Sequence, residues 1–319
     1  MRTAMSQKPK LPNIIFFGNE SIATGVSTDT PVLKGLVKSG YHVSLVVVNK
    51  HQVSSRCKGE LEIIQAAQAL NIPTASPARL ADIADQIKSI QPAIGILVAY
   101  GRIIPADILD LFPHGIINIH PSLLPEYRGP TPIEQAILDG KSQTGVTVMR
   151  VTPQMDAGPI LGQAKVTLRP SSSKQALADQ LLAEGYEMVF DLLPKILSHS
   201  AIEQEQNDDQ PTYTKLITKA DGKLNGTKSQ VQLAREVKAY AGWPSSYLEY
   251  KGKSITVLDA TASTVALPPG QLARVGKKLF FGCKGGSLEI IKLRPAGKSA
   301  MATSEFINGQ PDLSMIKVD

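Results

Sequence analysis

The sequence has little of what a secreted, membrane-bound or metal-clustering protein needs. Its 319 residues include only two cysteines, Cys57 and Cys283, too few for a disulfide framework or a cysteine metal cluster. No apolar run approaches the roughly 18 residues of a membrane span. The polar, basic start lacks the apolar segment of a secretory signal. We therefore expect a cytoplasmic protein with no membrane partner and no metal.

Aromatic residues make up only 5% of the chain, but 42% hydrophobic and 19% charged residues indicate an ordinary globular protein. The length predicts two domains. Charge is uneven: residues 210–319 hold 16 Lys+Arg against 8 Asp+Glu, whereas residues 1–209 hold 18 against 20. This asymmetry indicates either a region that binds a polyanion or a lysine-rich solvated surface, and composition alone leaves both open.

The first two-thirds of the chain alternates strand-like and helix-like segments. Apolar runs typical of buried strands alternate with amphipathic stretches typical of helices, which predicts an open, doubly wound α/β sheet. The predicted strands are 13–18, 42–49, 93–100, 115–120 and 144–152. The predicted helices are 31–39, 61–70, 105–112, 131–138 and 172–197.

The pattern changes after residue 197. Residues 198–211 are polar and acidic, which is typical of a linker. One helix is predicted at 228–240, and short strands at 247–250, 254–259, 270–275, 278–281 and 287–293. Short, evenly spaced strands predict a small antiparallel barrel or sandwich. The expected units are therefore a catalytic domain at 1–197, a linker at 198–211 and a second domain at 212–319.

Polar side chains stand at the end of one predicted strand. Asn118 and His120 are two residues apart, so both point to one face. In open α/β sheets, ligands bind outside the carboxyl ends of strands. Further along, Asp156 lies in the Gly-containing loop Met155–Gly158. An amide and a protonated imidazole can donate hydrogen bonds to an oxyanion, and a carboxylate can orient the imidazole or relay a proton. The alternative is that Asn118 and His120 merely cap the strand.

A longer pattern surrounds these residues. The runs Asn118-Ile-His-Pro-Ser-Leu-Leu-Pro-Glu-Tyr-Arg-Gly129 and Thr144-Gly-Val-Thr-Val148, followed by Asp156-Ala-Gly158, resemble the signature of formyltransferases that use 10-formyltetrahydrofolate. Ile14–Gly18 and Val98–Pro105 are similar to that family's first strand and to its strand beside the folate. The resemblance extends from about Asn13 to Gly309.

Two motifs in the last third narrow the resemblance. Ala241–Tyr247 and Leu293–Met301 resemble the branch of the family that formylates the methionine amine on initiator methionyl-tRNA. The resemblance implies a Rossmann-like formyltransferase domain followed by an OB-like barrel that binds tRNA. It also implies that the protein is an enzyme with 10-formyltetrahydrofolate as co-substrate. We expect a monomer.

Site residues follow from the same resemblance, position by position. Asn118, His120 and Asp156 correspond to the family's catalytic trio. The loop of Ser122, Leu123, Leu124 and Pro125 corresponds to its folate contacts. The loop Asn49–Glu60 holds Lys50, His51, Arg56 and Lys58, a weaker basic stretch than that of the family. Independently of the resemblance, Lys215, Lys219, Lys223 and Lys228 are candidate contacts to tRNA phosphate, and the alternative for each is an ordinary solvated lysine.

Other readings use the same trio. A formyltransferase could act on a nucleotide-linked amino sugar or on glycinamide ribonucleotide, or water could replace the amine in a hydrolase. A non-enzymatic RNA-binding protein is a fourth possibility, against which the intact trio argues. A nicotinamide site is poorly supported because Gly18–Gly25 does not have the G-x-G-x-x-G pattern.

Overall fold

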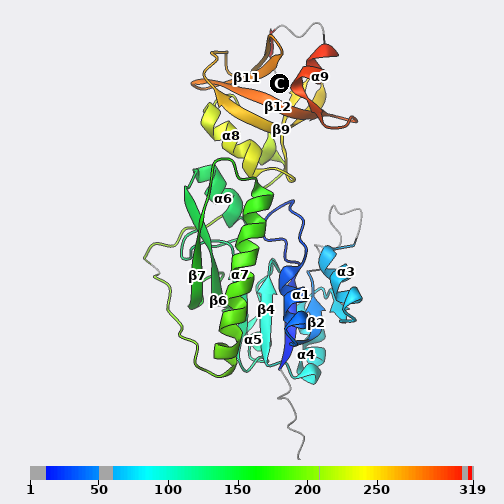
Figure 1. The fold of residues 1–319 in the computed structure, drawn as a ribbon, viewed down its shortest axis with the longest axis vertical. Helices are drawn as coiled ribbons and strands as arrows, with labels where there is room; N and C mark the ends of the chain where they lie inside the picture. Colours follow the sequence, from blue (N-terminus) through cyan, green and yellow to red (C-terminus); the bar gives the residue numbers. More distant parts are fainter. Residues whose placement is uncertain (1–11, 50–59, 208, 311–314, 318–319) are drawn as a thin grey trace, which may run out of the picture.

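A computed structural model describes residues 12–49, 60–207, 209–310 and 315–317. The chain forms two β-sheet units stacked along the long axis of the molecule (Figure 1). The first unit contains β1 to β7 and the second contains β8 to β14. The predicted α/β sheet followed by an antiparallel barrel is confirmed.

The first sheet has the strand order β3-β2-β1-β4-β5-β6-β7. Its strands are β1 (Asn13–Gly18), β2 (His42–Val47), β3 (Thr74–Ala75), β4 (Ile94–Val98), β5 (Ile116–His120), β6 (Gln143–Arg150) and β7 (Ile160–Thr167). The first five strands in this order run parallel, and β6 and β7 are antiparallel to their neighbours. The carboxyl ends of β1, β4 and β5 therefore meet at one edge of the sheet.

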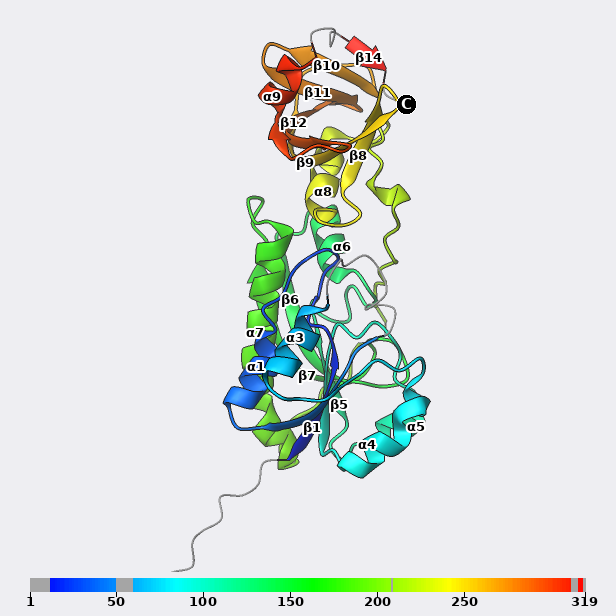
Figure 2. The same ribbon diagram turned by 90° about the vertical axis from the view of Figure 1, so that its right-hand side faces the viewer.

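Helices cover both faces of this sheet (Figure 2). One face carries α1 (Pro31–Lys38), α3 (Glu62–Ala69), α6 (Pro132–Asp139) and α7 (Lys174–Leu197). The other carries η1 (Leu80–Ile83), α4 (Ala84–Ile90) and α5 (Ala106–Leu109). The apolar run of β1 explains this layering, because Ile14 and Phe16 enter one core while Ile15 and Phe17 enter the other.

Four elements of this unit were not predicted: β3, η1, α4 and β7. Sequence patterns give no strand between residues 152 and 172, yet β7 forms the edge of the sheet there. An edge strand exposes alternate side chains, and the residues of β7 are correspondingly mixed rather than continuously apolar. The short α4 was missed because Ile87 is its one fully buried side chain, too little for an amphipathic pattern.

The second unit is a curved antiparallel sheet with strand order β14-β10-β11-β12-β9-β8. Its elements are η2 (Ala220–Gly222), α8 (Gln230–Ala239), β8 (Ser246–Tyr250), β9 (Lys253–Ser263), β10 (Gln271–Val275), β11 (Lys278–Cys283), β12 (Gly286–Pro295), β13 (Met301–Ala302), α9 (Thr303–Asn308) and β14 (Met315–Lys317). The strands wrap around a core that includes Leu233, Leu272 and Phe281 (Figure 2). Leu233 comes from α8, so this helix is part of the barrel core.

The two units touch through α6 and α8 and through a close backbone contact. Gly25 and Gly242 face each other so closely that a Cβ on Gly242 would clash with the Gly25 carbonyl. Nearby, Glu134 accepts hydrogen bonds from the backbone N–H and hydroxyl of Thr24, and the Thr24 hydroxyl lies 3.2 Å from the Trp243 carbonyl oxygen. The junction between the two units therefore consists of close backbone packing and defined hydrogen bonds.

Candidate active site

Asn118 and His120 occupy the carboxyl end of β5. They pair in register with Met149 and Thr147 of β6, which places both side chains on the same face. Asn118 is 7% exposed and His120 is 4% exposed, so both are largely withdrawn from water. Within the described residues, no group hydrogen-bonds to the Asn118 amide. A buried amide without a protein partner is the kind of group that a substrate would satisfy.

The orientation of His120 is set by a backbone carbonyl. Its Nε2 atom lies 3.0 Å from the carbonyl oxygen of Tyr127. Because a carbonyl oxygen only accepts hydrogen bonds, Nε2 must carry the hydrogen. The Nδ1 atom is therefore the ring position that can gain or lose a proton.

Asp156 reaches the same place from the loop between β6 and β7. Its backbone has φ 51°, in the left-handed region, which turns the side chain toward β5. Oδ2 accepts a hydrogen bond from the Gly129 N–H at 2.8 Å and lies 3.7 Å from Nδ1 of His120. The second distance exceeds a hydrogen bond, so in this arrangement Asp156 acts on the imidazole as a neighbouring negative charge.

The loop after β5 is stabilised by one hydrogen bond within the loop and one from β6. The Ser122 hydroxyl donates to the Glu126 carbonyl at 2.6 Å, and Thr147 donates to the Ser122 carbonyl at 2.7 Å. Ser122 is fully buried and Leu124 is 4% exposed, whereas Leu123 and Pro125 are half-buried. Among the four predicted folate contacts, Leu123 and Pro125 therefore present surface outward, and the side chains of Ser122 and Leu124 support the loop.

Two large apolar side chains are exposed beside this edge. Ile103, in the segment after β4, is 65% exposed, and Met155, next to Asp156, is 48% exposed. Exposed apolar side chains around buried polar groups are typical of the rim of a ligand site. The resemblance assigned the segment around Ile103 to the folate side, whereas Met155 had not been singled out as a contact.

Sequence reasoning missed Gln206, which lies in the predicted linker. Gln206 is 8% exposed. Its carboxamide oxygen accepts hydrogen bonds from Nε and Nη2 of Arg128 at 3.1 and 2.7 Å. Its carboxamide nitrogen donates to the carbonyls of Asp156 and Gly158 at 2.9 and 2.8 Å. The linker thus contributes a buried side chain to the surroundings of Asp156, and the polar sequence around it offered no signal.

The chain beyond Gln206 continues along the same loop. The Thr212 hydroxyl accepts the Tyr127 N–H at 2.7 Å, the Thr212 carbonyl accepts the Arg128 N–H at 2.8 Å, and the Thr214 N–H donates to the Arg128 carbonyl at 2.8 Å. Gln206 and residues 212–214 therefore pack beside the candidate site instead of lying in solvent between the two units.

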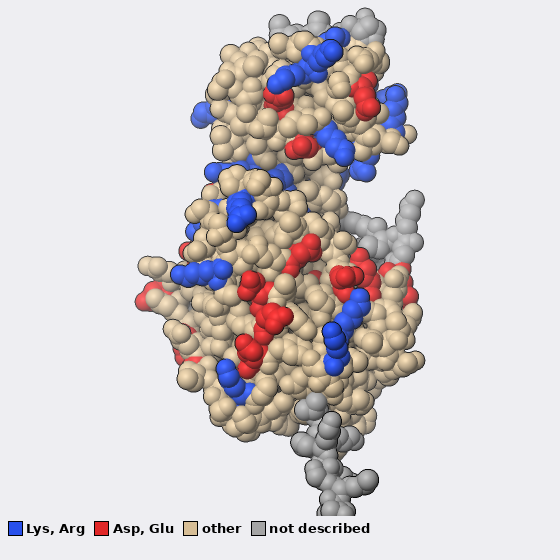
Figure 3. Space-filling view, viewed as in Figure 1, with Lys and Arg blue, Asp and Glu red and all other residues tan. Residues whose placement is uncertain are grey.

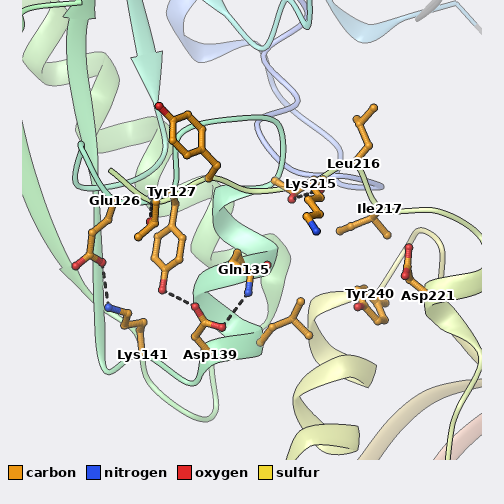
Figure 4. A pocket seen from close by; sticks show the side chains of 14 residues that line it. Glu126, Tyr127, Gln135, Asp139, Lys141, Lys215, Leu216, Ile217, Asp221 and Tyr240 are labelled. Carbon is orange, nitrogen blue, oxygen red and sulfur yellow. Dashed lines mark hydrogen bonds and ion pairs between the residues drawn. The ribbon is translucent and has the colours of Figure 1, made fainter. Parts of the chain in front are cut away.

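A cavity of about 490 Å³ opens next to this segment, between α6, residues 212–217 and the end of α8 (Figure 4). Tyr127 links the cavity to the site, because its carbonyl holds His120 while its hydroxyl donates to Asp139 at 2.7 Å. Burial, followed by the bond to Asp139, raises the pKa of Tyr127, and burial raises the pKa of Tyr240 to about 12. Both phenols are therefore neutral near pH 7, and the charged side chains of the lining are Lys141, Lys215, Glu126, Asp139 and Asp221.

The four candidate phosphate contacts differ in their surroundings. Lys219 donates to the Pro244 carbonyl at 2.7 Å, Lys228 pairs with Glu236 at 2.7 Å, and Lys223 lies 3.8 Å from Glu249. Of these four lysines, only Lys215 lines the cavity beside Tyr127. The basic residues at 50, 51, 56 and 58 lie outside the described residues. Basic side chains outnumber acidic ones on the visible face of the second unit, and acidic side chains gather over α7 (Figure 3).

Metal clusters and membrane-spanning helices are both missing from the described ranges. No three His, Cys, Asp or Glu side chains there converge in a way that could hold a metal ion. None of the helices in the described part of the chain is both long and apolar enough to cross a membrane.

An amide, an imidazole and a carboxylate thus lie together at the carboxyl edge of the first sheet, an arrangement whose chemistry can support acyl transfer. Residues 13–193 match the formyl transferase family, and residues 216–311 match the formyl transferase C-terminal domain. The chain belongs to the formyl transferase family, and it is a formyltransferase.

Curated relatives match over almost the whole chain. The methionyl-tRNA formyltransferase of Chloroflexus aggregans is 33% identical over 306 residues, covering 93% of this chain and 96% of that protein. The methionyl-tRNA formyltransferase of Thermodesulfovibrio yellowstonii is 32% identical over 301 residues, with the same shares covered.

Solved structures show the same fold at lower identity. The N-formyltransferase of Helicobacter canadensis, determined with folinic acid and dTDP-3-aminofucose, has a TM-score of 0.66 at 16% identity. That match covers 88% of this chain and 98% of that one. HypX of Aquifex aeolicus has a TM-score of 0.65 at 14% identity, covering 93% of this chain and 48% of HypX.

Proposed function

We propose that this enzyme transfers the formyl group of 10-formyltetrahydrofolate to the α-amine of methionine on initiator methionyl-tRNA. The names of relatives that match from end to end support this substrate pair. The observation that carries the proposal is the pair of Asn118 and His120 on one strand face, where the Asn118 amide has no hydrogen-bond partner among the described residues and is left to bind substrate.

In the proposed mechanism, Asn118, His120 and Asp156 are the catalytic residues. As the methionine amine adds to the formyl carbon, Asn118 and protonated His120 donate hydrogen bonds to the formyl oxygen, on which negative charge develops. Asp156 supports His120 and accepts a proton from the attacking nitrogen, directly or through water. The new bond joins the amine nitrogen to the formyl carbon, the bond from that carbon to N10 breaks, and the proton taken from the amine passes to N10.

The donor is proposed to lie along the loop of Ser122, Leu123, Leu124 and Pro125. The internal hydrogen bonds of this loop support a preformed wall, because they hold the half-buried Leu123 and Pro125 in place. The exposed side chains of Ile103 and Met155 supply apolar surface that suits a flat heterocycle.

The acceptor is proposed to bind across both units. The family models divide the chain between residues 193 and 216, which supports a catalytic domain at 1–197, a linker at 198–211 and a tRNA-binding domain at 212–319. The excess of Lys+Arg in the last third supports contact with a phosphate backbone. The cavity beside Tyr127 leaves room for the acceptor end. We propose that the protein works as a monomer in the cytoplasm.

One assay tests this proposal. The protein is incubated with 10-formyltetrahydrofolate and charged initiator tRNA, and formyl-methionine is measured after release from the tRNA. Formyl-methionine is the expected product. Formate released without tRNA would instead show hydrolysis, and formylation of an amino sugar nucleotide or glycinamide ribonucleotide in place of the tRNA would show another acceptor.

A salt titration tests the tRNA contact separately. Phosphate contacts make the logarithm of the association constant fall steeply with the logarithm of salt concentration. We expect such a slope for initiator tRNA binding to the whole protein. Affinity that scarcely changes with salt would contradict a phosphate-binding second domain.

A further inference from the structure

Gln206 uses both ends of its carboxamide in a single orientation. The oxygen accepts two N–H groups of Arg128, and the nitrogen donates to the carbonyls of Asp156 and Gly158. A flipped amide would set its N–H₂ against the guanidinium and its oxygen against two carbonyls, so the contacts allow only one orientation. At 8% exposure, these bonds face little competition from water.

The two loops that Gln206 joins are the loops that hold the Asp156 carboxylate. Gly129, next to Arg128, donates the 2.8 Å hydrogen bond to Oδ2 of Asp156. Gln206 fixes the backbone of Asp156 from the other side. The carboxylate therefore stands between two backbone segments that the Gln206 side chain joins directly.

We propose that Gln206 is a positioning residue for formyl transfer, holding the loops of Arg128 and Asp156 so that the Asp156 carboxylate stays beside Nδ1 of His120. This inference rests on the proposed function through the roles given there to Asp156 and His120. It makes the linker part of the catalytic apparatus. Residues 212–214, which lead into the barrel unit, hydrogen-bond to the same loop. The start of the second unit therefore contacts the surroundings of the site.

Three variants distinguish a positioning role of Gln206 from a purely structural role in holding the two loops together. Gln206→Ala removes both sets of bonds. Gln206→Glu keeps an acceptor for Arg128 but turns a carboxylate oxygen toward the carbonyls of Asp156 and Gly158. Gln204→Ala is the matched control, since Gln204 has the same residue type in the same segment and an exposed side chain.

The first measurement needs no substrate. Hydrogen–deuterium exchange is followed in peptides covering residues 153–159 of the full-length protein. We expect faster exchange in Gln206→Ala and Gln206→Glu than in wild type, and no change in Gln204→Ala. Unchanged exchange in both Gln206 variants would overturn the inference, whatever the acceptor turns out to be.

The second measurement is kinetic. Because misplacing a catalytic group by about 1 Å can cost 10²-fold, we expect kcat of both Gln206 variants to fall by about 10- to 100-fold, with KM for the formyl donor within about threefold of wild type. A rise in KM with unchanged kcat would contradict positioning. Full activity of Gln206→Glu would show that only the Arg128 contact matters and would also overturn it.

A double-mutant cycle identifies the residue through which Gln206 acts. Against Asp156→Asn, adding Gln206→Ala should lower kcat by less than about twofold further, since the group being positioned has already lost its charge. Multiplicative losses would show that Gln206 acts elsewhere and would overturn the inference. A wild-type protein that formylates no acceptor would defeat the proposed function, and the exchange experiment would then decide the role of Gln206.

Discussion

Oδ2 of Asp156 lies 3.7 Å from Nδ1 of His120 while the same oxygen accepts the Gly129 N–H at 2.8 Å. The carboxylate is thus anchored to the loop after β5 and faces the imidazole without a direct hydrogen bond. His120 is anchored independently through Nε2. In the proposed mechanism, the N–H at Nδ1 is therefore the ring donor left for the formyl oxygen, and Asp156 lies beside it.

The first prediction concerns this carboxylate. Asp156→Asn keeps the size of the side chain but removes its charge and its ability to accept a proton. We expect kcat for formyl transfer to fall by roughly 10²- to 10³-fold, since it removes a charged group acting in the transition state. The exposed Asp107 on α5 supplies the control, Asp107→Asn, which should retain wild-type kcat. An Asp156→Asn enzyme with near-normal kcat would remove Asp156 from the mechanism.

The second prediction concerns the two donors on β5. Asn118→Ala and His120→Ala each remove a hydrogen-bond donor to the formyl oxygen, which typically costs about 10²- to 10³-fold in kcat. We expect the affinity for the folate donor to fall much less, as measured by equilibrium binding. Thermal melting of both variants checks that the fold is retained. If either variant kept near-normal turnover, its assignment as an oxyanion donor would be wrong.

The third prediction concerns the junction of the two units. Gly242→Ala would drive a Cβ into the Gly25 carbonyl, whereas a Cβ on Gly252 meets nothing within 4 Å. Both glycines have positive φ, 79° and 68°, so the two alanine variants share a similar backbone cost. We expect Gly242→Ala to lower the free energy of unfolding by about 1–3 kcal/mol more than Gly252→Ala.

Kinetics extend the same comparison. Since Gly242→Ala disturbs the contact between catalytic unit and barrel, KM for methionyl-tRNA should rise while KM for the folate donor stays near wild type. Equal stabilities and equal KM values for the two alanine variants would show that the close approach of Gly25 and Gly242 is unimportant.

The fourth prediction concerns Glu20, a buried carboxyl group after β1. Its two oxygens accept the N–H groups of Val32 and Leu33 at 3.0 and 2.9 Å at the start of α1. Burial raises the pKa of Glu20 to about 7 against a lowering contribution from those two bonds. The folded protein therefore holds this proton more tightly than the unfolded chain does.

The consequence is a stability that declines with rising pH. The contribution of protonated Glu20 is fully present below about pH 4.5 and is lost as the pH approaches 7, by roughly 3 kcal/mol in all. Denaturant unfolding of wild type and Glu20→Gln between pH 4.5 and 8 checks this. The difference between the two proteins should change over this interval and become constant above it, and parallel pH dependences would show that Glu20 does not titrate there.

Much of the first unit was readable from its sequence because its strands are buried on both faces. The continuous apolar runs of β1, β2 and β4 are typical of buried strands. The two-residue spacing of Asn118 and His120 assigns both side chains to one face of β5. Short or exposed elements were not readable. In β7 and α4, few side chains enter the core, so their sequences carry little periodic signal.

The sequence by itself determined the classes of group at the candidate site and the family to which the chain belongs, because side-chain chemistry and motif spacing are written in the order of residues. Tertiary structure alone decided that His120 donates through Nε2 and that Asp156 faces Nδ1 without bonding to it. It also decided that Gln206, within the predicted linker, is buried and hydrogen-bonded to Arg128, Asp156 and Gly158. Those relationships join positions from 7 to 78 residues apart in the sequence, and only the folded chain brings their atoms close together.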